Sequence, residues 1–381
     1  MQARLQSSSP RAERGLSLIE ILVGVAIGII GVLAIFQTVV VWNKHTQTTS
    51  AGGDAQISGT LALFSIERDL KQAGHGFGTA AAPVMGCVVQ ASGPTPARGF
   101  SFPLSPVVVT PGAAGAPDQV DILYGDSSFF VCTEAFNFST PTTKKLARRN
   151  GFKPGDLAVI AGNGSASAAS SNCTLVEITD DTNVDGYTVA HAPGAYVSYY
   201  EAASGVTRFD PAGGTGALYS SGTMYSMGPA PVRNTWKIVN NRTLVRSELI
   251  QGTADTEVAD GVISLKAQYG IDANNNHKID AAEWSASAPA DWTTVLGVRV
   301  AILVRSRQFE RNGNAGASAA AAVTTAAPTW AGGAFLMTNV DGSADSFGPA
   351  TPDPNNWRYY RYRVYERVIP FKNMLWSTSP C

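Results

Sequence analysis

The pattern of apolar and polar positions begins with one membrane-length apolar run. Residues 1–14 are polar, with three arginines against one glutamate. Residues 16–42 are apolar and carry a single charged residue, Glu20. At about 1.5 Å per residue, a helix of this length spans a bilayer. Because the basic side stays in the cytoplasm, everything after Trp42 should lie outside it.

The helical pattern continues after this run with a changed apolar face. In residues 43–76, polar residues come first and two apolar stripes follow at helical spacing. The stripes are Ile57, Leu61 and Phe64, and then Leu63, Ile66 and Leu70. We predict that this half of the helix packs on a globular domain.

Glycines should shape this helix. Gly52-Gly53 is expected to bend or locally melt it. Gly74 and Gly76 are expected to end it, because glycine favours the conformation that follows a helix. The predicted helix therefore runs from about residue 16 to residue 73.

From about residue 80 onward the pattern is one of short strands and loops. Runs rich in β-branched and aromatic residues predict strands. They cover residues 118–125, 127–132, 155–162, 173–180, 187–192, 196–202, 235–249, 261–272, 295–309 and 357–373. Asn240-Asn241 is a hairpin-turn signal. Residues 91–117 are expected to be a long loop, and an Ala/Gly/Thr tract covers 312–334. The predicted fold class is α+β: a long N-terminal helix, its first half transmembrane, packed on a β-sheet-rich domain over 77–381.

Composition narrows the function classes. The chain has 381 residues, of which 15% are charged, and its formal net charge is −1. It has no basic field of the kind that nucleic-acid binding needs, so we exclude that class. Few charged residues, with many Gly, Ala, Ser, Thr and Pro, fit a β-rich, loop-rich protein outside the cytoplasm.

A short motif, RGLSLIE, spans Arg14 to Glu20 at the start of the apolar run. It resembles the class III signal of type IV pilins and type II secretion pseudopilins, which has a basic leader, a glycine, a short apolar stretch and a glutamate. The resemblance implies that 1–15 is a leader, and that a prepilin peptidase cuts after Gly15 and N-methylates Leu16. Phe or Met is commoner than Leu at this last position. An uncleaved signal anchor is the alternative.

Glu20 is a charge inside a membrane-length apolar run, where a lone carboxylate costs free energy. In the family that the motif resembles, subunits pack their helices into a filament core. There this glutamate can neutralise the α-amino terminus of a neighbouring subunit, and a paired buried carboxylate is tolerated. We therefore interpret Glu20 as an assembly residue. The alternative is a carboxylate that snorkels to the lipid headgroups.

Three further segments resemble PilW-type minor pilins, in the PilW/GspJ branch of the pilin superfamily. RDLKQAGHGFG (68–78) is similar to the run that closes the long helix in that family. GVRVAILVRSR (297–307) and YRVYERVIPFKN (362–373) are similar to the family's C-terminal end. The loop-rich middle of the chain, about 80–230, shows no such resemblance.

The resemblance implies a non-enzymatic minor pilin that joins a tip complex and primes type IV pilus assembly, with a part in twitching motility and cell adhesion. The implied partners are other minor pilins, the major pilin, the prepilin peptidase, the inner-membrane assembly platform and a large tip-associated adhesin. The implied location is the inner membrane of a Gram-negative bacterium, with the C-terminal domain in the periplasm, and later the pilus tip. One alternative is a GspJ-like pseudopilin of a type II secretion system. Another is a signal-anchored periplasmic enzyme or binding protein.

Four cysteines follow the apolar run, namely Cys87, Cys132, Cys173 and Cys381. None of them forms a CxxC pair. In an oxidising compartment, an even number suggests two disulfides, for which three pairings exist. Four buried free thiols are the alternative.

The segment DANNNHKIDAAE, residues 272–283, has the spacing of a calcium-binding loop. Its candidate ligands are Asp272, Asn274, Asn276, Lys278 through its carbonyl, Asp280 and Glu283. His277 departs from the pattern, because the EF-hand loop has Gly there for a positive φ. The alternative is an Asn-rich hairpin turn whose side chains cap their own backbone.

The sequence gives little support for a catalytic site. The sequence has no HExxH, GxSxG or P-loop pattern. Cys132 or Cys173 together with His191 would make a nucleophile pair, but cysteines in disulfides cannot serve. We therefore expect no enzymatic activity.

Two groups of charged residues have a structural interpretation. Asp118, Asp121 and Asp126 cluster near one predicted strand and are interpreted as solvated loop carboxylates. The arginines and tyrosines of RYYRYRVYER (358–367) would either form a binding face or cover an exposed strand, and we favour the second.

Overall fold

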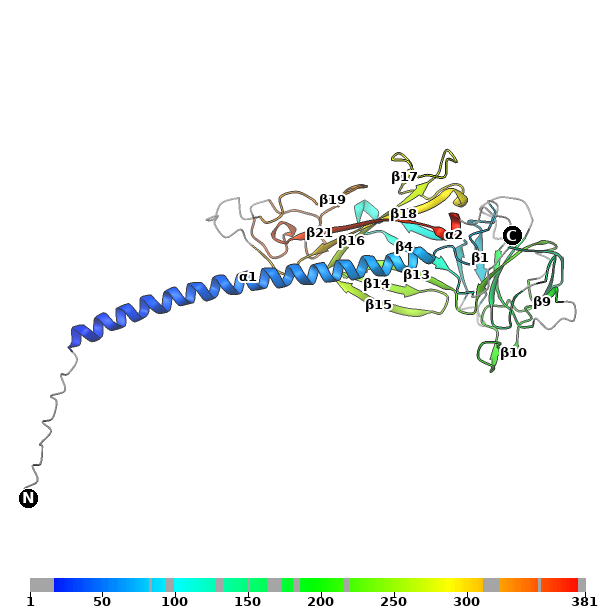
Figure 1. Cartoon of the computed structure of the whole chain (residues 1–381), viewed down its shortest axis with the longest axis horizontal. Helices are drawn as coiled ribbons and strands as arrows, with labels where there is room; N and C mark the ends of the chain where they lie inside the picture. Colours follow the sequence, from blue (N-terminus) through cyan, green and yellow to red (C-terminus); the bar gives the residue numbers. More distant parts are fainter. Residues whose placement is uncertain are drawn as a thin grey trace, which may run out of the picture. The chain divides into compact units, whose positions relative to one another are not determined.

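The computed structural model describes residues 17–81, 84–92, 99–127, 133–149, 151–162, 173–180, 186–215, 219–310, 322–348 and 351–375. The chain divides into two compact units, Met1–Gly53 and Asp54–Cys381. The helix α1 (Leu18–Gln72) runs through this division (Figure 1). It continues through Gly52-Gly53, so the expected melting of the helix at this pair is wrong. The predicted α+β fold class is confirmed.

The second half of α1 packs on the β-rich unit through one of its two apolar stripes. Leu63, Ile66 and Leu70 are buried in the main core. The other stripe, Ile57, Leu61 and Phe64, is exposed. The two stripes lie on roughly opposite sides of the helix, because an α-helix has 3.6 residues per turn. Sequence periodicity therefore identified both stripes, and the structure shows which of them faces the domain.

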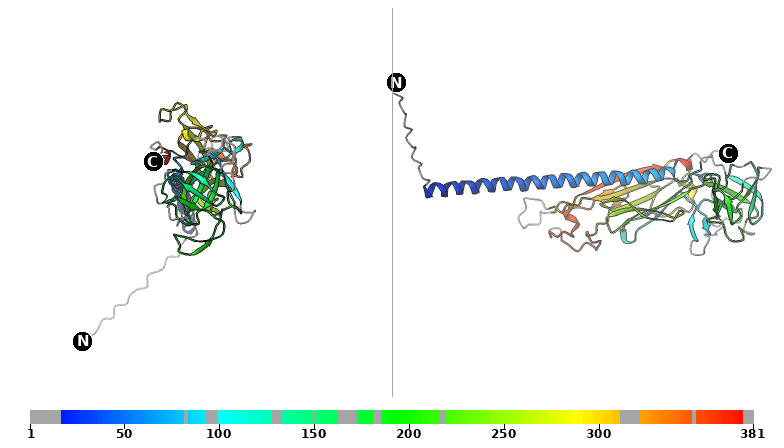
Figure 2. Two further views of the ribbon diagram at one scale, coloured as in Figure 1. Left: turned by 90° about the vertical axis from the view of Figure 1, so that its right-hand side faces the viewer. Right: turned by 90° about the horizontal axis from the view of Figure 1, so that it is seen from below.

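Helix α1 ends where the glycines predict. Gly74 and Gly76 both adopt positive φ angles, 81° and 92°. The Asn373 side chain donates to the carbonyls of Gln72 at 3.0 Å and Ala73 at 3.1 Å. These bonds satisfy backbone acceptors that a helix end leaves open. Asn373 belongs to the short helix α2 (Lys372–Leu375), which lies beside the end of α1 (Figure 2).

The largest sheet has eight strands in the order β2-β1-β8-β7-β12-β5-β6-β9. Their bounds are Phe100–Pro103 (β2), Val88–Ala91 (β1), Cys173–Glu177 (β8), Leu157–Gly162 (β7), Gly222–Gly228 (β12), Glu134–Ser139 (β5), Thr143–Leu146 (β6) and Thr188–Ala190 (β9). All neighbours pair antiparallel except β1 and β8, which pair in parallel. We call this part of the unit the eight-stranded lobe.

Two further sheets and the second half of α1 contribute to the main core, together with one face of the eight-stranded sheet, from which Val89, Val159 and Tyr225 are buried in it. One sheet has the order β15-β14-β13-β4-β3, with bounds Thr253–Asp260, Thr243–Glu248, Val232–Val239, Gln119–Tyr124 and Val107–Thr110. The other has the order β17-β16-β18-β21, with bounds Trp284–Ser285, Val262–Ile271, Val295–Arg305 and Tyr362–Pro370. A second, smaller core lies inside the eight-stranded lobe and includes Phe136, Ile160 and Met224.

Short elements complete the fold. Two hairpins pair β10 (Ala195–Val197) with β11 (Ser204–Val206), and β19 (Thr329–Trp330) with β20 (Gly333–Ala334). Three single-turn 3-10 helices are described, η2 (Ala113–Gly115), η4 (Trp292–Thr294) and η6 (Trp357–Tyr359). The predicted hairpin turn is confirmed, because Asn240 and Asn241 both have positive φ between β13 and β14.

The long loop expected at 91–117 is partly wrong. This stretch contains β2 and β3, in which Phe102, Val107 and Val109 are buried. Their alternation is only four residues long in each strand, and the surrounding Pro, Gly and Ala concealed it. The Ala/Gly/Thr tract at 312–334 contains β19 and β20. Of the strand predicted at 127–132, residues 128–132 lie outside the described residues.

Candidate functional site

The described part of the N-terminal unit is helical, and its residues from Leu18 to Trp42 are apolar and exposed, apart from a few polar positions such as Glu20. Among the described residues, α1 alone is long and apolar enough to cross a membrane. Its first half exposes large apolar side chains from Leu18 to Trp42. Glu20 lies in the first turn and is exposed. The predicted processing residues Gly15 and Leu16 lie outside the described residues, so cleavage stays a prediction.

Asp69 fixes the second half of α1 to the five-stranded sheet. Its carboxylate is fully buried and accepts hydrogen bonds from Asn234 Nδ2 at 2.7 Å and Trp236 Nε1 at 3.0 Å. Tyr124 Oη donates to it at 3.4 Å. Burial raises the pKa of Asp69, while the bonds from Asn234 and Trp236 oppose this shift. This residue was not singled out from the sequence, although its spacing of three from the buried Ile66 is a usable signal.

Strand β21 lies along the same half of α1. Arg363 Nη1 donates to Gln56 Oε1 at 3.0 Å, and Arg367 pairs with Glu67 at 3.5 Å. Gly59 faces the Tyr365 ring so closely that a Cβ there would overlap it. The helix end and the C-terminal strand, which both resemble PilW-type proteins in sequence, are therefore in direct contact.

The arginines of 358–367 have structural partners. Arg358 pairs with Asp345 at 2.6 Å, and Arg361 pairs with Glu310 at 2.8 Å. Together with the bonds of β21 to α1, these pairs support the structural interpretation of the segment.

Two of the three clustered aspartates are not solvated. Asp118 is buried and pairs with Lys266 at 2.8 Å, and Asp121 is buried and pairs with Arg233 at 3.2 Å. The interpretation as loop carboxylates is therefore wrong for both. Their cationic partners lie more than a hundred residues away in the sequence, so spacing could not reveal them. Asp126 is exposed, as expected.

A disulfide joins Cys87 and Cys173, with their Cα atoms 6.1 Å apart. It links the start of β1 to the start of β8, and both sulfur-bearing residues are buried. No cysteine among the described residues is free. Cys132 and Cys381 lie outside the described residues, so the second disulfide stays a prediction. Because Cys173 is bonded, it cannot act as a nucleophile with His191.

His191 instead faces a buried amine. Lys144 Nζ lies 3.1 Å from His191 Nε2 and donates to the Thr140 carbonyl at 2.9 Å and to Thr215 Oγ1 at 3.0 Å. Burial lowers the pKa of Lys144 to about 8 and that of His191 to about 3. The imidazole is therefore neutral and accepts through Nε2. The Lys144 ammonium group is therefore held by neutral acceptors, a carbonyl, a hydroxyl and an imidazole, with no carboxylate bonded to it among the described residues. We interpret this buried group of side chains as structural.

The first half of the 272–283 loop is folded around Asp272. Its carboxylate accepts the backbone N–H groups of Asn276 at 2.9 Å and His277 at 2.8 Å. Asn276 Oδ1 accepts the N–H of Lys278 at 2.9 Å. His277 has a φ of 60°, the positive value for which the EF-hand pattern has glycine. The departure from glycine therefore does not prevent the required backbone conformation.

The second half of the loop is closed by Glu283. Its carboxylate accepts the N–H groups of Ala273 at 3.0 Å and Asp280 at 2.8 Å. The amides of Asn274 and Asn276 donate to Asp280 Oδ2 at 3.3 Å and 3.1 Å. Within the described residues, no three His, Cys, Asp or Glu side chains are grouped to hold a metal ion. The loop as folded caps its own backbone, and calcium binding stays a prediction.

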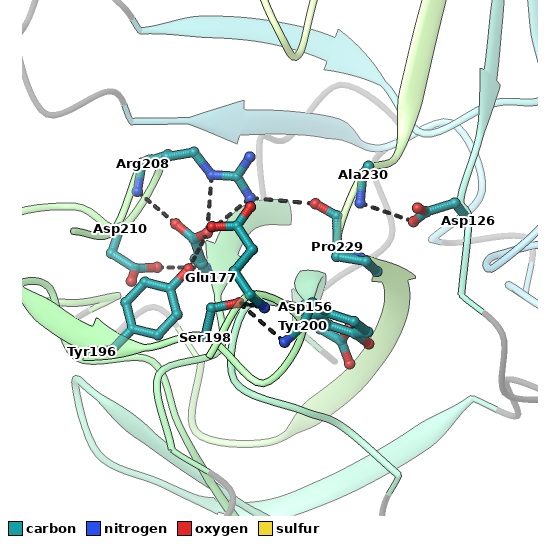
Figure 3. Close-up of polar contacts among 11 residues, drawn as sticks. Asp126, Asp156, Glu177, Tyr196, Ser198, Tyr200, Arg208, Asp210, Pro229 and Ala230 are labelled. Carbon is teal, nitrogen blue, oxygen red and sulfur yellow. Dashed lines mark hydrogen bonds and ion pairs between the residues drawn. The ribbon is translucent and has the colours of Figure 1, made fainter. Parts of the chain in front are cut away.

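A buried acidic cluster lies at the base of the β10–β11 hairpin (Figure 3). Glu177 from β8 is fully buried and pairs with Arg208 at 2.8 Å. Its carboxylate also accepts from Tyr196 Oη at 2.9 Å. Asp156 is buried nearby and accepts from Tyr200 Oη at 2.6 Å. Two carboxylates of the lobe thus hold two tyrosines of one hairpin, in a part of the sequence that suggested no site.

Asp210 is a third buried acidic residue in this cluster, and it is mainly protonated. Its Oδ1 accepts the N–H of Glu177 at 2.7 Å, while Oδ2 is buried with no partner among the described residues. Burial raises the pKa of Asp210 to about 8, and the nearby Glu177 charge adds to this shift. Asp210 is therefore mainly protonated at neutral pH.

We expect Asp210 to make stability fall with rising pH. A carboxyl whose pKa is raised on folding stabilises the protein fully below its unfolded pKa, about 3.9, and loses that effect as pH rises through about 8. Asp210→Asn should therefore gain stability relative to the wild type between pH 5 and pH 8. Urea unfolding of the full chain in detergent at several pH values measures this gain. Glu201→Gln, at an exposed carboxylate, is the control, and a pH-independent difference for Asp210→Asn would refute the assignment.

Comparison with known proteins relates the C-terminal part of the chain to one family. Residues 233–373 match the family model described as Type IV Pilus-assembly protein W, or PilW. No curated protein matches the sequence. A solved structure, a type IV-like pilin from Thermus thermophilus, is 8% identical, covers 83% of this chain and 94% of that chain, and has a TM-score of 0.30, which is too low to carry an argument. The matched residues include β14 to β18 and β21, and they contain the two C-terminal segments whose resemblance was predicted from the sequence; we call residues 233–373 the PilW region, after the family model that they match.

Proposed function

We propose that the protein is a non-enzymatic minor pilin that joins a tip complex and primes type IV pilus assembly. The observation that carries this proposal is the match of residues 233–373 to the PilW family model. Strand β21 of this region lies along the second half of α1, and the first half of α1 is an exposed apolar helix long enough to cross a membrane. An isolated apolar helix needs lipid or other helices around it. A filament core supplies such helices after the subunit leaves the membrane.

The partners and location follow from this proposal. The chain would be processed by prepilin peptidase and handled by the inner-membrane assembly platform. It would then contact other minor pilins, the major pilin and a large tip-associated adhesin. Its β-rich unit would lie in the periplasm before assembly and at the pilus tip afterwards, where twitching motility and adhesion depend on it.

Two measurements test the proposal. The intact mass of the N-terminal peptide from host membranes should show a chain that starts at N-methylated Leu16. Glu20→Ala should then sharply reduce surface pili, because the carboxylate that pairs with a neighbouring terminus is lost, whereas Gln37→Ala in the same helix should not. An unprocessed chain in a host whose other pilins are processed would return the protein to the signal-anchor class.

The phenotype of a deletion strain distinguishes a minor pilin from the alternative, a GspJ-like pseudopilin. Deletion of a pilus component removes surface pili and leaves exoprotein secretion intact, whereas deletion of a pseudopilin does the reverse. We expect the first result.

We also propose that the 272–283 loop binds calcium, through the six residues predicted from the sequence. The positive φ of His277 supports this proposal. Calcium at 100 times its Kd should stabilise the protein by about 2.7 kcal/mol, seen as a higher melting temperature than in chelator. Trp284 follows the loop and stacks on Arg299 at 4.8 Å, so its fluorescence offers a second reading. The effect should vanish in Asp280→Asn, and a melting temperature that ignores both calcium and chelator would remove the idea.

A further inference from the structure

Strand β21 is a regular edge strand of the four-stranded sheet. It pairs with β18 alone, over its nine residues and without a bulge. Just beyond its two ends, the N–H of Phe371 donates to the Leu296 carbonyl at 2.8 Å, and the N–H of Ser306 donates to the Arg361 carbonyl at 2.8 Å. Residues 361 and 371 therefore face β18. Because the bonds of an antiparallel pair alternate, the even-numbered residues direct their backbone groups away from β18.

The outward backbone groups of β21 form a free edge. Among the described residues, no backbone hydrogen bond other than those to β18 involves residues 362–370. Glu366, Arg367 and Val368 are exposed, so the C-terminal half of this edge is open to solvent. It offers two N–H groups, of Glu366 and Val368, and the carbonyls between and beside them. An extended peptide segment is the partner that such a row accepts.

The other edges of the three larger sheets are short or irregular. Strands β2, β3, β9 and β17 have two to four residues each. Strand β15 is longer, but its pairing with β14 contains two register shifts. Short and bulged edge strands prevent pairing with other chains. Among the described edges, β21 is the long and regular exception, and the irregular β15 of a second copy is a poor partner for it.

The second half of α1 presents an apolar ring beside this edge. Figure 1 shows β21 alongside the helix, where Arg367 pairs with Glu67 at 3.5 Å. Phe64 lies one turn before Glu67, on the side away from the buried Ile66, and is 62% exposed. A strand added to β21 would lie about 4.8 Å further out, next to Phe64. It would cover an apolar side chain that the unit itself leaves in solvent.

The charges on this side of the edge are mainly positive. Glu67 is shared by two cations, Lys71 at 2.7 Å and Arg367 at 3.5 Å. Arg363 donates to a neutral amide oxygen of α1. Arg68 is exposed and has no carboxylate partner among the described residues. Four cations with one carboxylate favour acidic side chains on the docked strand.

The opposite side of the edge is apolar at its end. Because residues 363, 365 and 367 contact α1, the side chains of Glu366 and Val368 point to the other face of the sheet. Glu366 already accepts the N–H of Ala331 at 3.1 Å. Val368 is 51% exposed. We therefore expect an apolar residue of the docked strand beside Val368.

We propose that the free edge of β21 takes up an extended segment of another pilus protein as an added strand. The segment bonds to the backbone of Glu366 and Val368. On the side of α1 it carries an acidic residue near Arg68 and an apolar one on Phe64. This inference rests on the proposed function, because the partner belongs to the same pilus.

The partner is identified by photo-crosslinking of the full chain in its native host. A benzophenone amino acid in place of Phe64 should give one protein adduct, and the linked peptide should contain Asp or Glu. The same probe at Val197, 61% exposed in the eight-stranded lobe, should not capture this partner.

Backbone pairing is tested by Val368→Pro, which removes an N–H that β18 does not use. It should lower the adduct yield at residue 64 by about tenfold. Val368→Ala keeps the N–H and should lower the yield by less than about twofold. Urea unfolding of each purified variant in detergent checks the fold. If Val368→Pro does not fold, a second pair of variants decides: Arg68→Glu should lower the yield by about tenfold, and Arg68→Gln by less.

Several outcomes would overturn the added strand. They are no adduct at residue 64 in cells whose pili contain the processed chain, an adduct with lipid or with a second copy, a linked peptide from the apolar helix of another pilin, and equal yields in folded Val368→Pro and Val368→Ala. The N-terminal mass and the presence of the chain in sheared pili are measured in the same cells. An unprocessed chain, or one absent from pili, would instead contradict the proposed function.

Discussion

Replacing Asp69 by alanine should destabilise the β-rich unit by about 3 to 5 kcal/mol. The substitution leaves Asn234, Trp236 and Tyr124 without their shared acceptor in a fully buried site. Each buried donor that loses its partner costs about 1 to 3 kcal/mol. Urea unfolding of the full chain in detergent, followed by tryptophan fluorescence, measures the loss.

Asp69→Asn is the matched variant. Its amide oxygen can still accept from Asn234 and Trp236, while its own NH₂ group can donate only to the Tyr124 hydroxyl, which then no longer donates to residue 69. We expect a stability between those of the wild type and Asp69→Ala. A loss below about 0.5 kcal/mol for Asp69→Ala, the level of ordinary surface substitutions, would show that Asp69 does not hold α1 on the sheet.

Removing the disulfide with Cys87→Ser and Cys173→Ser together should destabilise the unit by about 4 kcal/mol. The bond closes a long loop, since the two cysteines are 86 residues apart in sequence. Opening it lets the unfolded chain gain conformational entropy. Unfolding in urea without reductant compares the double variant with the wild type.

The control for this prediction is Ser204→Ala, an exposed position that leaves all four cysteines in place. It should keep the stability of the wild type. A double variant as stable as the wild type would mean that the bond adds nothing to the folded unit.

The sequence predicted features that depend on neighbouring residues. The membrane-length helix, its end at Gly74 and the turn at Asn240-Asn241 each follow from local composition and spacing. The PilW resemblance also rested on short contiguous segments, and the family match over residues 233–373 confirms it for the two C-terminal ones.

Features that depend on distant residues were missed or misassigned. Asp69 meets Asn234 and Trp236, which are 165 and 167 residues away in sequence. The Glu177 cluster joins residues from β8 and from the chain after β11, and no motif announces it. The sequence also did not show which of the two apolar stripes of the helix is buried. Both stripes are apolar, and the packing of the sheets against the helix determines which of them is covered.

The contacts between α1 and the C-terminal segment have a mechanical consequence. Gln56 meets Arg363, Glu67 meets Arg367, and Gln72 meets Asn373, so the contacts follow one another in the same order along both segments. A pull along the axis of this half of α1 would load these contacts in shear, all at once, instead of opening them one after another like a zipper. Residues 363–373 would therefore transmit a force on the helix to the four-stranded sheet through several contacts loaded together.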